Sequence, residues 1–93
     1  MAQTRKVAGR ATSIRTEDSF TNVRYHNTDV VSFNDRCIVL RSGGWHSATT
    51  KLRMNQTSNQ FGLGFNVRQK SFGWFVDFKE SSYPFEDGMA LLR

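Results

Sequence analysis

The side chains of this sequence that could do covalent or acid–base chemistry are few and scattered. His26 and His46 are the only histidines, and their spacing matches no metal-ligand motif. A Ser/His/Asp set could be drawn from Ser47, His46 and Asp29, but no local segment resembles a nucleophile elbow. Adjacent His46 and Ser47 are explained more simply as a polar turn and a helix cap. We therefore expect no enzyme activity, no metal site and no cofactor.

Basic and amide side chains near aromatic residues are the stronger signal. Arg68, Lys70 and Phe75 are expected on the outer face of one hairpin, where a cation beside an exposed ring suits single-stranded nucleic acid. A polar and basic helical segment earlier in the chain could contact phosphates or base edges, through Lys51, Arg53, Asn55 and Gln56. A solvated helix face is an equally good explanation of those four residues.

A glycine pair and a tryptophan mark the middle of the chain. Gly43-Gly44 before a helix could present backbone N–H groups to a phosphate. The spacing of a P-loop is absent, so a strand-to-helix hinge is the simpler interpretation. Trp45 is either a core side chain that closes the end of the sheet or an exposed anchor for a partner.

The distribution of charge is more informative than the net charge of +5. Residues 1–15 hold four basic side chains and no acid, and residues 36–76 hold six basic side chains and no acid. The segments 16–35 and 77–93 are acidic overall. An acid-free block across the middle of a domain favours a polyanionic partner.

Length and composition exclude several classes of protein. The 93 residues fit one domain, and a single cysteine, Cys37, rules out an intrachain disulfide. No apolar run approaches the roughly 20 residues of a membrane span, and the first residues lack the apolar region of a signal peptide. The default expectation is a protein of the cytoplasm.

Two hairpins are predicted from alternating apolar residues. In the first, Asn34-Asp35 forms a two-residue turn, and Val31 pairs with Ile38. In the second, residues 65–79, the turn falls at 70–73 and one face is apolar. That face carries Phe65, Val67, Trp74, Val76 and Phe78.

One helix is predicted between the hairpins, from residue 48 to about residue 60. Ser47 is its expected N-cap, and Gly62 follows its last turn. The tail of the chain has apolar residues at helical spacing, which predicts a short docking turn; they are Phe85, Met89 and Leu92.

The predicted fold class is α+β, with an antiparallel sheet of four to five strands made of two hairpins and one helix between them. Residues 1–15 are expected to form a flexible basic arm with a short edge strand near its end, and residues 16–93 a single α+β domain.

Four runs have a specific order of residue types: His26-Asn27-Thr28-Asp29-Val30-Val31, Gly43-Gly44-Trp45, Thr49-Thr50-Lys51-x-Arg53-Met54-Asn55-Gln56 and Gly73-Trp74-Phe75-Val76. They resemble runs in a set of small proteins encoded by bacteriophages and prophages, over roughly residues 24–79. This resemblance implies a phage or mobile-element origin and action in the bacterial cytoplasm. It implies no particular activity, and no site residue is carried over from it.

These observations predict a small non-enzymatic binding protein of phage type that engages nucleic acid or a host nucleoprotein complex through a basic surface. A bacterial defence complex, inhibited in an anti-CRISPR-like manner, is one such partner. The alternative is a protein–protein interaction module or a minor virion component without direct nucleic-acid contact. A homodimer through an exposed strand edge or sheet face stays open, and no membrane contact is expected. The predicted binding residues are Lys51, Arg53, Asn55, Gln56, Arg68, Lys70, Phe75 and Trp45.

Overall fold

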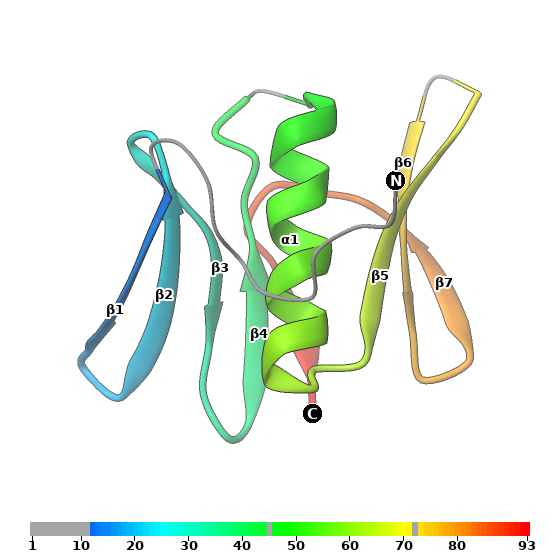
Figure 1. Cartoon of the computed structure of the whole chain (residues 1–93). Helices are drawn as coiled ribbons and strands as arrows, with labels where there is room; N and C mark the ends of the chain where they lie inside the picture. Colours follow the sequence, from blue (N-terminus) through cyan, green and yellow to red (C-terminus); the bar gives the residue numbers. More distant parts are fainter. Residues whose placement is uncertain (1–11, 45, 72) are drawn as a thin grey trace.

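The computed structural model of the protein describes residues 12–44, 46–71 and 73–93. These residues form eight strands and one helix (Figure 1). In chain order the elements are β1 (Thr12–Glu17), β2 (Phe20–Tyr25), β3 (Thr28–Phe33), β4 (Cys37–Leu40), α1 (Ala48–Phe61), β5 (Phe65–Lys70), β6 (Gly73–Phe78), β7 (Ser81–Pro84) and β8 (Met89–Leu92). Residues 12–15 of the predicted arm belong to β1, while the rest of that arm and Trp45 lie outside the described residues.

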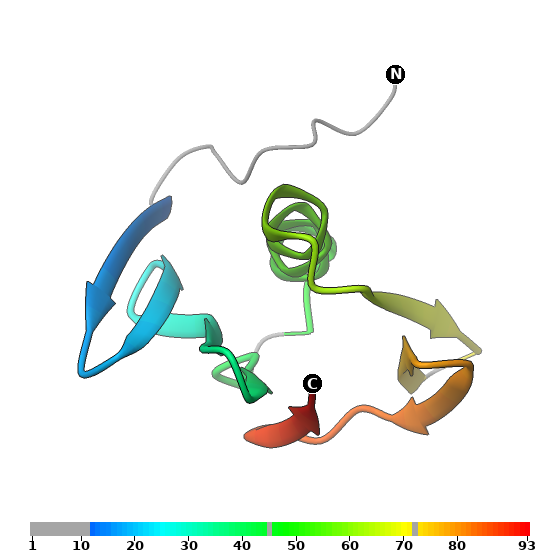
Figure 2. The ribbon, with the colours of Figure 1, turned by 90° about the horizontal axis from the view of Figure 1, so that it is seen from below.

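The strands form two antiparallel sheets that curve around the helix (Figure 2). The larger sheet has the strand order β1-β2-β3-β4-β8, and the smaller has the order β5-β6-β7. Seen from below, the sheets form an open trough with α1 in its mouth. The predicted α+β class is confirmed, but the single predicted sheet is corrected to two, because the second hairpin builds a sheet of its own.

The end of the chain departs most from the prediction, since two strands replace the docking turn. β7 pairs with β6, whereas β8 pairs with β4 and places Met89 opposite Leu40 and Leu91 opposite Ile38. The helical spacing of the apolar residues gave the wrong prediction of a docking turn. Leu91, rather than Leu92, is the residue that is buried in the core. Leu91 is 4% exposed and Leu92 is 75% exposed, which is the alternation of a strand.

The β3–β4 hairpin turns later than predicted. Val31 pairs with Leu40 rather than with Ile38. The carboxamide oxygen of Asn34 accepts a hydrogen bond from the backbone N–H of Arg36 at 2.8 Å, so the Asn34 side chain stabilises the longer turn. A register shift of two residues leaves each side chain on its face, and the predicted core face is buried. It consists of Val31, Phe33, Ile38 and Leu40.

A β-bulge in β3 brings two neighbouring valines into the core. After the pair Val23–Val31 the register shifts, so that Arg24 lies opposite Asp29 and Val30 is the extra residue. Val30 and Val31 are 1% and 0% exposed. Arg24 and Asp29 form an ion pair of 3.0 Å. The bulge therefore resets which residues of β3 lie on the outer side of the sheet.

The β5–β6 hairpin has the predicted register. Its pairs include Phe65–Phe78, Val67–Val76 and Gln69–Trp74. The predicted apolar face is buried in one cluster with side chains of the larger sheet. Met54 of α1 is fully buried in the same cluster, so one core holds both sheets and the helix together.

The helix begins and ends as predicted. The Ser47 side chain accepts a hydrogen bond from the N–H of Thr50, and Gly62 adopts a left-handed conformation with φ of 63° at the C-terminal end. A left-handed residue at this position ends a helix at little steric cost only when it is glycine. The caps are local signals, which is why the sequence alone located both ends.

Polar side chains of α1 close the free edge of β5. The carboxamide of Asn55 donates to the carbonyl oxygen of Val67 at 2.9 Å and accepts from its N–H at 2.7 Å. The Ser58 hydroxyl makes the same pair of bonds with Phe65, at 2.7 and 3.0 Å. Edge backbone groups that would otherwise be buried without a partner are thus satisfied. The helix consequently lies alongside β5 and runs antiparallel to it.

Candidate nucleic-acid interface

Three of the four predicted helix residues point into the domain. Arg53 and Asn55 are each 9% exposed, and Gln56 is 4% exposed. The reason is the trough: α1 lies between the two sheets and is buried at every residue from 53 to 58. This burial corrects the expectation that Arg53, Asn55 and Gln56 share an accessible helix face with Lys51, which is half-buried.

Arg53 illustrates how a charge is accommodated inside this fold. Its Nε donates to the hydroxyl of Thr12 at 2.9 Å, and Nη1 donates to the side-chain oxygen Oε1 of Gln56 at 3.2 Å. Its guanidinium carbon lies 5.7 Å from the centre of the Tyr25 ring, within the range of a cation–π contact. Arg53 therefore connects the helix to β1 and β2.

The outer side of the smaller sheet carries the other predicted residues. Arg68, Lys70 and Phe75 share this side, as their register requires, and the Arg68 guanidinium lies 5.3 Å from the centre of the Phe75 ring. Arg68 Nε also donates to both carboxylate oxygens of Asp77, at 3.1 and 2.9 Å, and a terminal nitrogen donates to Ser82 at 2.9 Å. Of the two cations expected on this side of the sheet, Arg68 is thus already paired with an acid.

Asp77 is a charged neighbour of Arg68 that was not among the predicted binding residues. Hydrogen bonds from Arg68 and Ser82 hold the pKa of the Asp77 carboxyl below its usual value of 3.8, so it is ionised at neutral pH. The predicted register already placed Asp77 on the same face as Arg68, and this diagonal relationship was the available signal.

Two lysines lie at the same end of the molecule as Arg68. The helix runs antiparallel to β5, with Ser58 beside Phe65 and Asn55 beside Val67. Continued by one more turn, this alignment brings the start of α1, which includes Lys51, level with the end of β5, which includes Lys70. Figure 1 shows both element ends at its top, with the β5–β6 turn to one side of the helix. We call Arg68, Lys70 and Phe75, on the outer side of the smaller sheet, the basic–aromatic face; Lys51 lies on α1 at the same end of the molecule.

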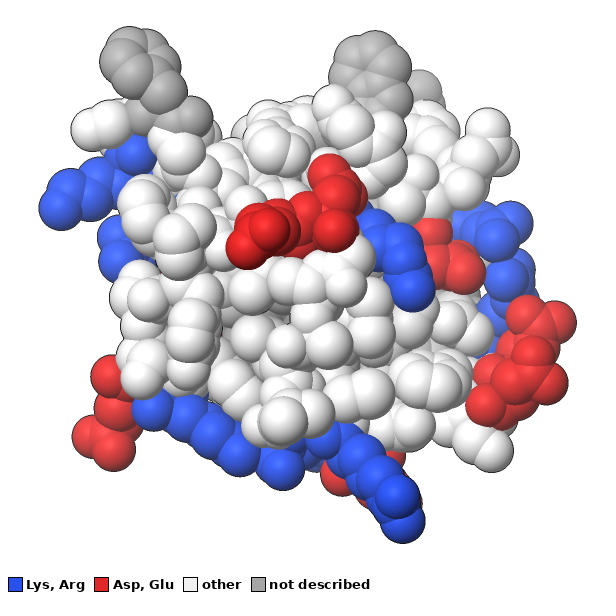
Figure 3. All heavy atoms as spheres, turned by 180° about the vertical axis from the view of Figure 1, so that it is seen from behind, with Lys and Arg blue, Asp and Glu red and all other residues white. Residues whose placement is uncertain are grey.

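The acid-free block of the sequence does not become an acid-free surface. Its residues fold against acids from other segments, as Arg68 does with Asp77. Figure 3 shows the outer sides of the sheets, where basic and acidic groups alternate around a largely neutral area. Within the described residues, the local basic–aromatic face is the feature that carries the prediction.

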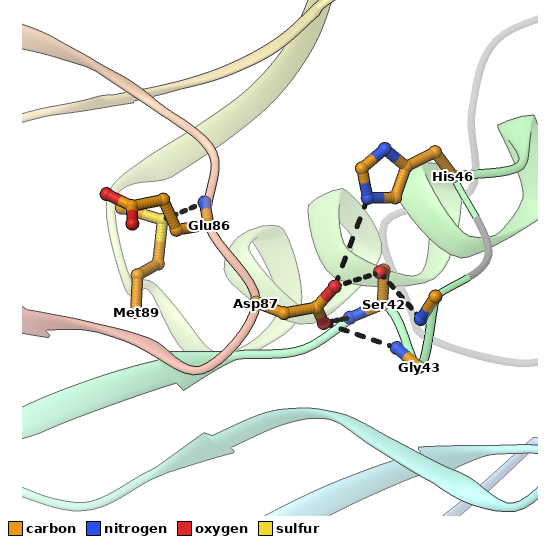
Figure 4. A network of polar contacts seen from close by, with 7 residues as sticks. Ser42, Gly43, His46, Glu86, Asp87 and Met89 are labelled. Atoms are coloured by element: carbon orange, nitrogen blue, oxygen red, sulfur yellow. Dashed lines mark hydrogen bonds and ion pairs between the residues drawn. The ribbon is translucent and has the colours of Figure 1, made fainter.

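A loop before the helix is held by Asp87 (Figure 4). Its carboxylate accepts hydrogen bonds from the N–H and hydroxyl of Ser42 at 2.5 and 2.7 Å and from the N–H of Gly43 at 3.3 Å. His46 Nε2 lies 4.0 Å from Asp87. Serine, histidine and aspartate meet here, but the Ser42 hydroxyl donates to the carboxylate, and among the described residues it has no hydrogen bond to His46 of the kind a catalytic triad requires. The arrangement connects two loops.

The same loop is fixed by aromatic contacts. The His46 ring stacks on Trp74 with a centroid distance of 4.7 Å and meets Phe85 edge-on at 5.5 Å. Trp74 and Phe85 are 5.4 Å apart. These contacts join the start of the helix to the smaller sheet, and they hold in place the end of α1 that carries Lys51.

A membrane-spanning helix and a group of metal ligands are both absent from the described part of the chain. No helix in it is long and apolar enough to cross a membrane. Nor do three or more His, Cys, Asp or Glu side chains gather there in a group that could hold a metal ion.

Comparison with known proteins identifies a family. No curated protein and no solved structure matches the chain. The model of the Kyanoviridae Gp96 protein family matches residues 1–92. This match confirms the predicted phage origin, and the chain therefore belongs to the Kyanoviridae Gp96 protein family.

Proposed function

We propose that the protein is a non-enzymatic phage binding protein that contacts nucleic acid through its basic–aromatic face. The observation that carries the proposal is the Arg68 guanidinium over the Phe75 ring, on the outer side of a sheet and next to Lys70. A base can stack on an aromatic ring while neighbouring cations contact the phosphates on either side, which is how single strands are bound without strict sequence preference.

The charges of this face favour weak binding by the protein alone. Asp77 neutralises part of the Arg68 charge, so Lys51 and Lys70 supply most of the attraction for phosphate. Each phosphate contact releases counterions, and affinity for a single strand falls with salt by a slope of about 0.7 per contact. Few contacts predict a shallow slope and weak binding alone, which fits a protein that acts within a larger nucleoprotein complex.

The cellular setting of the proposal is the infected bacterium. A phage protein with a small nucleic-acid-binding face can act on a host nucleoprotein complex, including a defence complex of the CRISPR kind. The family membership supports the phage origin, and the basic–aromatic face supports the class of partner.

Titration of a fluorescent single-stranded oligonucleotide tests the proposal. We expect binding at low salt that weakens as salt rises, and we expect Lys70→Glu, Lys51→Glu and Phe75→Ala each to weaken it. Arg36→Glu is the matched control, because Arg36 is exposed in the β3–β4 turn at the opposite end of the molecule. No binding at low salt, or equal losses in Lys70→Glu and Arg36→Glu, would exclude the basic–aromatic face as the site.

A further inference from the structure

A pocket of about 470 Å³ lies between the β2–β3 turn and the start of α1. Its volume falls in the range of roughly 300–1,000 Å³ that is usual for small-molecule sites. Residues 25–28 of the turn form one wall, and Ser42, Ser47 and Thr50 form the other. Figure 1 shows that the turn and the start of the helix lie at the same end of the molecule.

The packing of the backbone fixes the walls of this pocket. The β-bulge in β3 turns Val30 to the core side, where it is 1% exposed and lines the pocket. The loop before α1 lies directly against the start of β3, because a Cβ at Gly43 would overlap the Thr28 hydroxyl. On the helix side, Ser47 caps the first turn through Thr50. The pocket is therefore part of the packed fold.

The two walls differ in their hydrogen bonds. The hydroxyls of Ser42 and Ser47 on the helix side are already bonded to other residues. On the turn side, the side chains of Asn27 and Thr28 make no hydrogen bond to another residue of the described chain. Asn27 is exposed and Thr28 is half-buried, so water satisfies both until a ligand displaces it. The hydrogen-bonding capacity that a ligand can use thus lies on the turn.

Aromatic rings flank these polar groups. The ring of His26 lies 4.4 Å from that of Tyr25, measured between centroids. Rings of this kind stack on nucleobases. The Asn27 carboxamide places a donor beside an acceptor, and the edge of a base offers the complementary pair.

The absence of charged groups narrows the class of ligand. Among the described residues that line the pocket there is no Asp, Glu, Lys or Arg. A phosphate, a carboxylate or an ammonium group would find no opposite charge there. An uncharged planar ring with polar edges needs none, and a nucleobase has this chemistry.

We propose that this pocket binds a single nucleobase, whose ring lies against His26 and Tyr25 and whose edge is hydrogen-bonded to Asn27. The base belongs either to a free nucleotide or to a nucleic-acid strand. The proposal goes beyond the basic–aromatic face, because the pocket is built by the larger sheet and the start of α1 and requires no phosphate contact.

NMR titration of the full chain with three small probes tests the proposal. The probes are adenosine, ribose 5-phosphate and N-acetyltryptophanamide. We expect adenosine alone to shift the ring signals of His26 and the backbone signals of Asn27 and Thr50. No shift with adenosine at millimolar concentration would overturn the proposal. So would equal shifts with ribose 5-phosphate, which indicate an anion site, or with N-acetyltryptophanamide, which indicate a pocket for an aromatic side chain of a partner protein.

Two further probes, adenosine monophosphate and an oligoadenylate, distinguish the sources of the base. Binding of the oligoadenylate more than about ten-fold tighter than that of the monophosphate, with the same shifted signals, assigns the base to a strand. Equal affinities assign it to a free nucleotide, and in both cases the base is the ligand. Lys70→Glu should leave adenosine affinity unchanged, so a failure of the basic–aromatic face can be told apart from a failure of the pocket.

His26→Gly separates binding from folding. His26 has φ of 56°, which glycine adopts without steric cost, so the Tm should hold while adenosine affinity falls by about ten-fold. Ser19→Gly is the matched control, because Ser19 is exposed, has φ of 68° and lies at the other end of β2; it should leave affinity unchanged. Asn27→Ala tests the hydrogen bonds at an exposed residue and should weaken binding several-fold. Unchanged adenosine affinity in both His26→Gly and Asn27→Ala would overturn the proposal.

Discussion

The carboxamide of Asn55 is hydrogen-bonded to both backbone groups of Val67, at 2.9 and 2.7 Å. A side chain of the helix thus takes the position of the next strand, and β5 is closed as an edge. These two hydrogen bonds between Asn55 and Val67 explain why a helix with few apolar residues is nevertheless fixed in the trough. It also explains why Asn55 is unsuited to contact a partner.

Asn55→Ala should lower the free energy of unfolding by about 2–4 kcal/mol, since the N–H and the carbonyl oxygen of Val67 each lose a buried partner. Denaturation in urea measures the loss. Asn66→Ala is the control, because Asn66 lies on the exposed side of the same strand, and its effect should stay within about 0.5 kcal/mol. Equal effects of the two substitutions would contradict the role of Asn55 at the β5 edge.

Gly43→Ala should destabilise the protein more than Gly44→Ala. A Cβ at Gly43 would lie 2.3 Å from the Thr28 hydroxyl oxygen, whereas a Cβ at Gly44 meets nothing within 4 Å. Both glycines have positive φ, 68° and 85°, so both substitutions carry a backbone penalty of roughly 1–2 kcal/mol. The difference in free energy of unfolding between the two variants, measured by urea denaturation, gives the cost of the clash between the new Cβ at residue 43 and Thr28.

The double variant Thr28→Ala/Gly43→Ala checks the cause of that difference. Removing the Thr28 hydroxyl should restore part of the stability lost in Gly43→Ala, as a positive coupling in a double-mutant cycle. Strict additivity would show that the clash with Thr28 is not responsible.

The confirmed predictions of the hairpin register and the helix ends depend on local signals in the sequence. The strict alternation from Phe65 to Phe78 determined both the register and the buried face of the β5–β6 hairpin. Ser47 and Gly62 marked the helix ends. Each of these predictions depends on residues that are neighbours in sequence or across one short turn, where pattern and structure are directly linked.

The β1–β2 and β6–β7 hairpins could not be predicted because their turns lack glycine. Asp18 and Ser19 have φ of 52° and 68°, and Lys79 and Glu80 have φ of 51° and 63°. Turns with two positive φ values are usually recognised by Asn-Gly or Asp-Gly, so neither β1–β2 nor β6–β7 had the expected signature. These turns keep their shape through strand pairing on both sides.

Long-range contacts determined which candidate residues are accessible. Asn55 is buried because β5 has a free edge there, and Arg68 is partly neutralised because Asp77 lies diagonally across the hairpin. No pattern within α1 indicates the first relationship. Trp45 lies outside the described residues, and its role stays a prediction, as does a homodimer.

Asp87 makes the stability of the loop before α1 dependent on pH. Burial of the carboxyl raises its pKa, but hydrogen bonds from Ser42 and Gly43 outweigh burial and hold the pKa below 3.8. A pKa that is lower in the folded state stabilises the protein above the unfolded-state pKa, and this contribution is lost as the pH falls through the folded-state value.

Asp87→Asn should therefore be less stable than the unmodified protein at pH 7, and the difference should shrink once the pH falls below about 4. Thermal denaturation across this pH range measures it. Glu86→Gln is the matched control, since Glu86 is an exposed neighbouring acid and its substitution should leave the pH profile unchanged. A difference independent of pH would show that the Asp87 charge does not stabilise the loop.

Asp77→Asn should strengthen the binding of single-stranded oligonucleotides. The carboxylate of Asp77 now occupies Arg68 Nε through two hydrogen bonds, at 3.1 and 2.9 Å, and the substitution frees that charge for a phosphate. The salt dependence should then steepen by about 0.7, the value of one further contact with a single strand. Glu80→Gln changes the net charge equally at an exposed turn residue. If both variants strengthen binding by the same factor, net charge alone is responsible and Arg68 makes no specific contact; a gain confined to Asp77→Asn assigns a phosphate contact to Arg68.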